Sequence, residues 1–432
     1  MSLTELGLVY SVILVGCLLG GVYIGVAMGL AGVAGITMMF GTSLWPSLAD
    51  VVWNNATSFS LIAVPLFILM GELILQGGIA TRFYAGLAPW FRRVPGGLAQ
   101  TNIAGSAVFS AVCGSSVATT LTIGSIAIKE MRARGYHDSL TLGTLAAGGG
   151  LGILIPPSIP MIVYASITNV SIIQLFMAGI VPGVLLALLF CIFVGIRAWL
   201  NPSLVPDQAA SEVSEGGSLL RDALPVMLLV GAVILSMYFG IVTPTEAAAL
   251  GAVLAGVISW AYGGLSRAAI RSSLVNATIS SAVIMFITIC AQILQYSLVV
   301  TGFGKQIAEI VVAMNIGPFV FFCVLLLIYL VIGMFMDGLS VMLVTVPLVY
   351  APMIAMGFDG IWIGILLIFV IELSAITPPV GLNLFALQSI STETPLSRIA
   401  WSSAPYCLII LGFAFLCYAF PQIILWLPQT MR

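Results

Sequence analysis

The sequence predicts an all-α polytopic membrane protein made of two inverted repeats, and three observations support this fold class. First, 61% of the 432 residues are hydrophobic and only 6% are charged, whereas a soluble domain carries roughly 25% charged residues. Second, most Lys and Arg residues fall in clusters between long apolar runs. Third, consecutive prolines interrupt two of these runs, at Pro156-Pro157 and again 222 positions later at Pro378-Pro379.

Composition also narrows the function classes. The chain has one histidine, no paired acids on one apolar run and no metal-binding spacing among its seven cysteines. We therefore expect no enzyme active site and interpret the cysteines as small core hydrophobes. The net charge of -2 gives no indication of a nucleic-acid partner. No Lys or Arg precedes the first apolar run, so we do not expect a cleaved signal peptide.

The positive clusters predict the topology. Cytoplasmic segments of membrane proteins are enriched in Lys and Arg, and placing each cluster in the cytoplasm puts eleven of the thirteen positive residues there. The chain then starts outside, and the polar segment 201–221 is a cytoplasmic linker between two halves. Because a helix crosses a bilayer in about 20 residues, the predicted spans are 5–25, 27–45, 57–80, 139–168, 174–197, 222–240, 244–263, 272–301, 360–391 and 401–428.

Two apolar segments do not fit a simple crossing. Residues 94–128 have positive clusters on both sides, so both ends face the cytoplasm, and the segment is short for two crossings of about 20 residues each. We expect a re-entrant hairpin over about 94–134, with its tip in CGSSVATT (113–120). A second hairpin, over about 315–358 with MDGLS (336–340) at its tip, is expected to enter from the outside. The alternative is two tilted full spans in each segment.

The two halves align when 222 is subtracted from positions in the second half. The two proline pairs then coincide, and the tip around Asp337-Gly338 falls on Ser115-Ser116. Residues 1–200 and 222–432 are therefore predicted as repeats of three spans, a hairpin, a span broken at its prolines and a last span. The charge topology starts the first repeat outside and the second inside. This inverted arrangement is the plan of many secondary transporters.

The proline pairs need a physical reason. Two prolines in a row break a helix, because each lacks a backbone donor and clashes with the carbonyl four residues back. In lipid, each carbonyl left without a partner costs several kcal/mol. A cation near the bilayer midplane, bound by unwound carbonyls of 139–168 and 360–391 and by tip hydroxyls, would supply a reason. Helix N-termini pointing to the same place would favour an anion. The alternative is a proline kink that only shapes packing.

Five stretches carry a resemblance to a known family. They are GSSVATTLTIGSIAIKEMRARGY (114–136), LGILIPPSIPMIVYASIT (151–168), GIVTPTEAAALGAV (240–253), GMFMDGLSVMLVTVPL (333–348) and ITPPVGLNLF (376–385). In this order, and over nearly the whole chain, they look like the large membrane subunit (the DctM-like, or M, subunit) of tripartite ATP-independent periplasmic (TRAP) transporters.

The resemblance implies an elevator-type fold of the ion-transporter superfamily. Both hairpins and both broken helices would form a mobile transport domain, and the rest a scaffold. It implies sodium-coupled uptake of an organic anion, of carboxylate or sulfonate type, across the bacterial inner membrane. A small four-helix membrane subunit and a periplasmic substrate-binding protein are the implied partners. Sodium is the coupling ion, and no other cofactor is expected.

Carried over by position, the resemblance implies two sodium sites and one substrate site. Each sodium site pairs a hairpin tip with a helix break, and the substrate lies between the two tips. The first sodium site would comprise Gly114, Ser115, Ser116 and Thr119 with the break from Gly152 through Pro156 to Pro157. The second would comprise Met336, Asp337 and Gly338 with Thr377, Pro378 and Pro379. The substrate residues would be Ser115, Ser158, Asp337 and Asn383.

Two other functions fit part of this pattern. One is a sodium/dicarboxylate symporter of the same fold that works without a binding protein. The other is a passive anion channel, although a channel more often carries a ring of fixed charges.

Two further polar groups have open roles. Thr243 to Glu246 has the form of a helix-capping box. Glu372, midway along a predicted span, would either pair inside the bundle or act indirectly on the second sodium site.

Overall fold

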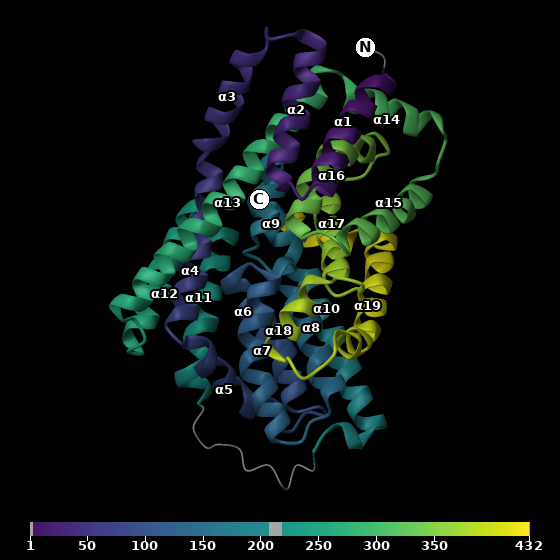
Figure 1. The fold of residues 1–432 in the computed structure, drawn as a ribbon. Helices are drawn as coiled ribbons and strands as arrows, with labels where there is room; N and C mark the ends of the chain where they lie inside the picture. Colours follow the sequence, from purple (N-terminus) through teal and green to yellow (C-terminus); the bar gives the residue numbers. More distant parts are fainter. Residues whose placement is uncertain (1–2, 207–217, 432) are drawn as a thin grey trace.

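The computed structural model describes residues 3–206 and 218–431, and every regular element in these ranges is helical (Figure 1). This confirms the all-α, multi-pass architecture that the composition predicted. Eight helical segments in the described ranges are long and apolar enough to cross a membrane. They are Phe59–Gln76, Asp138–Thr168, Ile172–Leu200, Leu219–Tyr238, Pro244–Ala261, Arg267–Val300, Gly338–Ala355 and Leu396–Ala419.

The helices follow the chain from α1 to α20. The first half contains α1 (Leu3–Leu19), α2 (Ile24–Phe40), α3 (Trp45–Ala56), η1 (Phe59–Ile62), α4 (Ala63–Gln76), α5 (Ile79–Phe91), α6 (Leu98–Cys113), α7 (Ser116–Ala133), α8 (Asp138–Leu154), α9 (Ile159–Thr168), α10 (Ile172–Leu200) and η2 (Pro202–Leu204). The second half contains η3 (Leu219–Ala223), α11 (Leu224–Tyr238), α12 (Pro244–Ala261), α13 (Arg267–Val300), α14 (Phe303–Ala313), α15 (Pro318–Gly333), α16 (Gly338–Ala355), α17 (Gly360–Ala375), α18 (Leu382–Ile390), α19 (Leu396–Ala419) and α20 (Gln422–Thr430).

Helices α2, α4, α12 and α13 form one closely packed group (Figure 1). Glycines permit the close approach: a Cβ atom on Gly32 of α2 would lie 2.9 Å from backbone atoms of Ile293 in α13. A Cβ atom on Gly77, at the end of α4, would lie 2.6 Å from Ser259 Oγ of α12. That hydroxyl donates to the carbonyl of Leu73 at 2.9 Å. This group belongs to the part of the chain predicted as scaffold.

Helix α8 lies at the centre of a second group, in which it packs against α6, α7 and α17. The run Gly148-Gly149-Gly150 lets three neighbours approach in turn, α6 at Ser106, α7 at Thr120 and α17 at Glu372. Of the most apolar stretch of the α8–α9 segment, 89% is buried inside the protein. The α8–α9 segment is therefore shielded from lipid by the rest of the protein, and this group holds the first hairpin tip and the first helix break.

Each half contains one tight hairpin and one interrupted helix. Only residues 114–115 separate α6 from α7, and residues 334–337 separate α15 from α16. Residues 155–158 separate α8 from α9, and residues 376–381 separate α17 from α18. Both interruptions contain a proline pair, and both Pro-Pro peptide bonds are cis. The re-entrant placement of the hairpins and their inverted orientation stay predictions.

The ends of several elements differ from the predicted spans. The span predicted at 401–428 is wrong in extent, because α19 ends at Ala419 and α20 begins at Gln422. Pro421 lies between them; it lacks a backbone donor and disfavours helical geometry at the preceding residue. The short helices α3, α5 and α14 were not predicted as separate elements. Residues 207–217 of the predicted linker lie outside the described part of the chain.

The capping box predicted at Thr243 is confirmed. The Thr243 hydroxyl accepts from the backbone N–H of Glu246 at 3.4 Å, and the backbone N–H of Thr243 donates to the Glu246 carboxylate at 2.8 Å. Both interactions satisfy donors at the start of α12. This stretch therefore has a structural explanation for its polarity.

Candidate functional site

The first hairpin tip lies directly on the first helix break. A Cβ atom on Gly152, near the end of α8, would lie 2.8 Å from the carbonyl oxygen of Ser115. A Cβ atom on Gly114 would lie 3.1 Å from the carbonyl oxygen of Pro157. Gly114 has a positive φ of 59°, which glycine adopts without a steric penalty. The two glycines thus bring the backbones of the tip and the break into contact, and each contact involves a carbonyl oxygen, that of Ser115 or that of Pro157.

Several oxygen atoms at this contact have a defined environment. The Ser115 hydroxyl caps α7 by accepting from the backbone N–H of Ala118 at 3.4 Å. Ser158 is fully buried, and its hydroxyl donates to the carbonyl of Ile153 at 2.6 Å. The Thr119 hydroxyl is buried and has no hydrogen-bond partner within the described residues. Buried polar groups are nearly always paired, so Thr119 offers a free oxygen just behind the tip.

The second tip packs against α17 about one helical turn before that helix reaches the second break. Gly338, the first residue of α16, packs against the side chain of Ile371 in α17, with no room for a Cβ atom. The carboxylate of Asp337 caps α16 by accepting from the backbone N–H of Ser340 at 3.0 Å. The Thr377 hydroxyl donates to the carbonyl of Leu373 at 2.5 Å. Its oxygen keeps acceptor capacity toward a cation.

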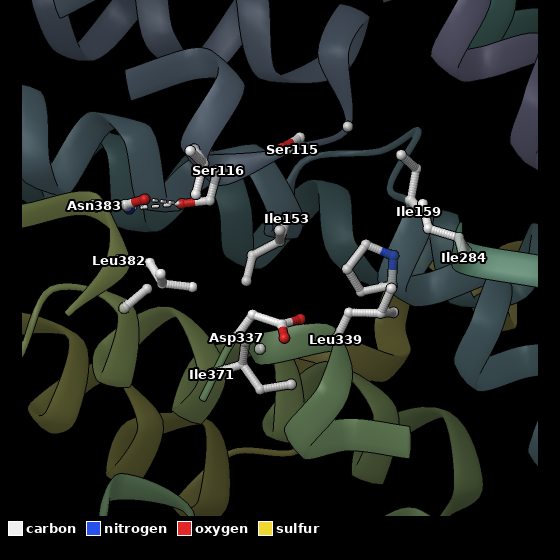
Figure 2. Close-up of a pocket in the computed structure, with 15 residues that line it drawn as sticks. Ser115, Ser116, Ile153, Ile159, Ile284, Asp337, Leu339, Ile371, Leu382 and Asn383 are labelled. Atoms are coloured by element: carbon white, nitrogen blue, oxygen red, sulfur yellow. Dashed lines mark hydrogen bonds between the residues drawn. The ribbon is translucent and has the colours of Figure 1, made fainter. Parts of the chain in front are cut away.

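A cavity of about 170 Å³ lies between the two tips. On one side of it Ser116 and Asn383 are hydrogen-bonded, with Ser116 Oγ 2.9 Å from Asn383 Oδ1. Figure 2 shows the carboxylate of Asp337 across the cavity from this pair and directed into it. The cavity is lined by Gly114, Ser115, Ser116, Val117, Ile153, Ile159, Pro160, Ile284, Asp337, Gly338, Leu339, Ile371, Ala375, Leu382 and Asn383.

Two features of the cavity have opposite effects on an anion. Helices α7, α9, α16 and α18 all begin at residues that line it, and helix N-termini favour anions through their free N–H groups and dipole. Asp337 is the one charged side chain among the described residues that line it. Asp337 therefore opposes an anion in this cavity, whereas the helix N-termini favour one.

The predicted site residues divide into two sets. The structure brings Gly114, Ser115, Ser116, Asp337, Gly338 and Asn383 together around one cavity. The residues that do not line it are Thr119 of α7, Gly152, Pro156 and Ser158 at the first break, Met336 of the second tip, and Thr377 and Pro378 of the second break. A substrate contact by Ser158 stays a prediction, since its hydroxyl is directed to Ile153.

Sequence reasoning did not identify the apolar wall of the cavity. Ile284 of α13, Ile371 of α17 and Leu382 of α18 all contribute to it (Figure 2). More than half of the chain is hydrophobic, so an isoleucine at a cavity carries no signal that separates it from one facing lipid. Ile284 is informative, because α13 belongs to the predicted scaffold while the tips belong to the predicted transport domain.

Glu372 lies in the last turn of α17 and is fully buried. Neither carboxylate oxygen has a hydrogen-bond partner within the described residues. A Cβ atom on Gly150 of α8 would lie 2.7 Å from its Cγ and Oε1 atoms. Subtracting 222 from 372 gives 150, so the two positions that coincide in the repeat touch each other. One expectation for Glu372 was a pairing inside the bundle. No such partner is found among the described residues.

Two tips on two interrupted helices, enclosing a mainly apolar cavity with a few polar side chains inside a helical bundle, define a class of protein: the secondary membrane transporters. Residues 11–423 match the family model described as "Tripartite ATP-independent periplasmic transporter, DctM component". The chain belongs to this family, so the family predicted from the five stretches is confirmed. It is a multi-pass inner-membrane transporter subunit.

Curated relatives cover nearly all of the chain. It is 33% identical, over an alignment of 445 positions, to the C4-dicarboxylate TRAP transporter large permease protein DctM of Vibrio cholerae, covering 97% of each chain. It is 31% identical to the ectoine TRAP transporter large permease protein TeaC of Halomonas elongata, covering 96% of this chain and 97% of TeaC. The 2,3-diketo-L-gulonate TRAP transporter large permease protein YiaN of Escherichia coli is 28% identical, with 96% and 97% covered.

Solved structures share the fold. The YdaH transporter of Alcanivorax borkumensis superimposes with a TM-score of 0.64 at 15% identity, over 88% of this chain and 90% of YdaH. MtrF of Neisseria gonorrhoeae superimposes with a TM-score of 0.57 at 13% identity, over 91% and 85%. Identities this low support the fold alone.

Proposed function

We propose that this subunit couples the inward movement of sodium to the import of an organic anion by an elevator mechanism. It acts with a small four-helix membrane subunit and a periplasmic binding protein that delivers the anion. The observation that carries the proposal is the contact of each polar hairpin tip with an interrupted helix. Backbone carbonyls and hydroxyls that meet inside a bundle are suited to a hard cation, which prefers oxygen ligands.

Sodium would bind at both contacts. The first offers backbone oxygens at Ser115 and Pro157, together with the unpaired hydroxyl of Thr119. The second offers the Thr377 hydroxyl and the carbonyls freed around Pro378. The full proposed set comprises Gly114, Ser115, Ser116, Thr119, Gly152 and Pro156 at the first site, and Met336, Asp337, Gly338, Thr377 and Pro378 at the second.

The cavity between the tips would hold the anion. Ser115 and Asn383 offer polar contacts, and the four helix N-termini favour negative charge. Asp337 opposes it: like unit charges about 4 Å apart repel by about 4 kcal/mol at an effective dielectric constant of about 20. An anion therefore enters beside Asp337 only after a cation has bound there. Sodium binding becomes a condition for anion binding, which is the coupling that symport requires.

Relatives support a carboxylate substrate. C4-dicarboxylates and 2,3-diketo-L-gulonate, after which two relatives are named, are organic acids. Ectoine, after which another is named, also carries a carboxylate. We therefore assign the substrate to carboxylate-bearing small molecules, with the choice among them made largely by the binding protein.

The cavity position supports an elevator. Ile284 of α13 lines the cavity from the predicted scaffold, whereas the other lining residues come from the hairpins and broken helices. The cavity thus lies at the boundary between the two predicted domains. A rigid movement of the hairpins and broken helices along α13 would carry it from one membrane face toward the other.

Reconstitution tests the proposal. The chain is placed in proteoliposomes with its small subunit, and the binding protein is loaded with the ligand that stabilises it most in a thermal-shift screen. A sodium gradient is expected to accumulate the ligand above its external concentration. Equal uptake driven by a proton gradient in sodium-free buffer would overturn sodium coupling. Equilibration without accumulation would indicate a channel, and full activity of the chain alone would indicate a symporter that needs no binding protein.

A further inference from the structure

Helix α5 connects the two groups of helices. It follows α4 of the predicted scaffold and precedes α6 of the first hairpin (Figure 1). Its buried face contacts the protein through Ile79, Ala80, Phe83, Tyr84, Gly86 and Leu87. With 13 residues, it is too short to cross a bilayer, which takes about 20. Any contact that holds α5 in place therefore acts on the link between scaffold and hairpin.

The positive residues in α5 and directly after it fall into two kinds. Arg82 lies over the ring of Tyr262, with 5.2 Å from its guanidinium carbon to the ring centroid. Arg92 and Arg93, at the other end, are exposed, and no ion pair or hydrogen bond to them is found within the described residues. By contrast, Arg132 has its own acidic partner: its Nε lies 2.9 Å from Asp138 Oδ1.

The two free arginines border an open hollow. Pro89, Trp90, Arg92 and Arg93 line it, and its volume is about 730 Å³. That size lies within the roughly 300–1,000 Å³ typical of small-molecule sites. The indole of Trp90 is 64% exposed beside it. Tryptophan is enriched at the membrane–water interface, with its ring at headgroup level. The hollow therefore combines an interfacial anchor with two uncompensated guanidinium groups.

The charge of the hollow selects its occupant. The Arg82–Arg93 region is one of the positive clusters that predict the cytoplasmic side, and the cytoplasmic leaflet carries anionic lipids that attract basic segments. Guanidinium groups bind phosphate oxygens in a two-pronged geometry. We propose that Trp90, Arg92 and Arg93 bind the headgroup phosphate of an anionic phospholipid. The lipid anchors the end of α5 at the membrane surface and steadies the link between scaffold and first hairpin.

Helix α14 provides a natural contrast, because it occupies the position that corresponds to α5 in the repeat. Its lysine is matched by an acid one turn later: Lys305 Nζ lies 3.8 Å from Glu309 Oε1. Lys305 thus has an acidic neighbour in its own helix, whereas Arg92 and Arg93 have none among the described residues. The predicted topology also places α14 on the outer side, so α5, and not α14, is expected to face the anionic cytoplasmic leaflet.

Native mass spectrometry of the full chain with its small subunit tests the proposal. The detergent-purified complex is titrated with phosphatidylglycerol and, separately, with phosphatidylcholine. Phosphatidylglycerol is expected to bind preferentially, and Arg92→Gln/Arg93→Gln should lower its affinity about 30-fold, as the product of roughly fivefold for each arginine near an anionic surface. Arg92→Lys/Arg93→Lys keeps both charges but loses the two-pronged guanidinium geometry, so its affinity should lie between those of the wild type and the glutamine variant.

A matched control removes two other exposed charges from the same predicted membrane side. Arg267→Gln/Arg271→Gln, at the start of α13, should leave phosphatidylglycerol affinity within about twofold of wild type. The proposal is overturned if the control loses as much affinity as the Arg92/Arg93 variant, or if the lysine variant loses as much as the glutamine variant. Displacement of the lipid by millimolar inorganic phosphate would also overturn it, by showing a site for small anions instead.

Discussion

Replacing Gly152 with alanine tests the contact between the first tip and the first break. The new Cβ atom would lie 2.8 Å from the carbonyl oxygen of Ser115 and 2.9 Å from the Cα atom of Ser116. Both are backbone atoms, so the tip itself must move. Overpacking of this kind costs about 1–3 kcal/mol. If sodium binding requires the close contact, this cost corresponds to an apparent affinity about five- to 150-fold weaker at the first site.

Thermal stability in sodium chloride against choline chloride measures this affinity without a known substrate. A ligand at 100 times its dissociation constant stabilises a protein by about 2.7 kcal/mol, and a 100-fold weaker affinity leaves about 0.4 kcal/mol. The second site is unchanged in Gly152→Ala, so the sodium titration should become biphasic, with one component moved to higher concentration. Gly412→Ala in α19, whose Cβ atom meets nothing within 4 Å, is the control. Superimposable titrations for Gly152→Ala and Gly412→Ala would refute the reasoning.

Three further predictions concern neighbouring features. Ser116→Ala removes the hydroxyl bonded to Asn383. A lost hydrogen bond of about 0.5–1.5 kcal/mol should raise the sodium concentration for half-maximal uptake about two- to tenfold. An unchanged concentration would show that this hydroxyl does not contribute to the first sodium site. Gly150→Ala should lower thermal stability, and Glu372→Ala in the same chain should restore part of it, because the two side chains compete for one space; strictly additive effects would contradict the contact. A single cysteine at Asn315 in a cysteine-free background should react only with impermeant reagent added outside. Labelling from the cytoplasm would contradict the predicted inverted repeat.

Much of the fold follows from general chemistry that the sequence displays. A charged fraction of 6% excludes a soluble domain, and proline cannot donate within a helix, so interruptions at both proline pairs were predictable. Polar residues in the apolar runs also pointed to the tips. Ser115, Asp337 and Asn383, which lie far apart in the sequence, line one cavity.

Other features depend on tertiary contacts that a single sequence does not display. The ends of α19 and α20 depend on how the chain turns at Pro421, and prolines elsewhere, such as Pro405, lie inside a helix. The hydrogen bond from Ser116 to Asn383 joins the two repeats, and no local sequence pattern predicts it. The meeting of Gly150 with Glu372 is visible only when the repeat offset and the packing of α8 on α17 are combined.

Direct binding of radioactive sodium to the purified subunit tests the central claim, that each hairpin tip forms a sodium site with the interrupted helix that it contacts. The account predicts saturable binding that an excess of potassium or choline does not displace. It predicts partial loss of affinity in Gly152→Ala and in Thr377→Ala, and loss at both sites in the double variant. Binding that is absent in the wild type, or unaltered in the double variant, would contradict the account.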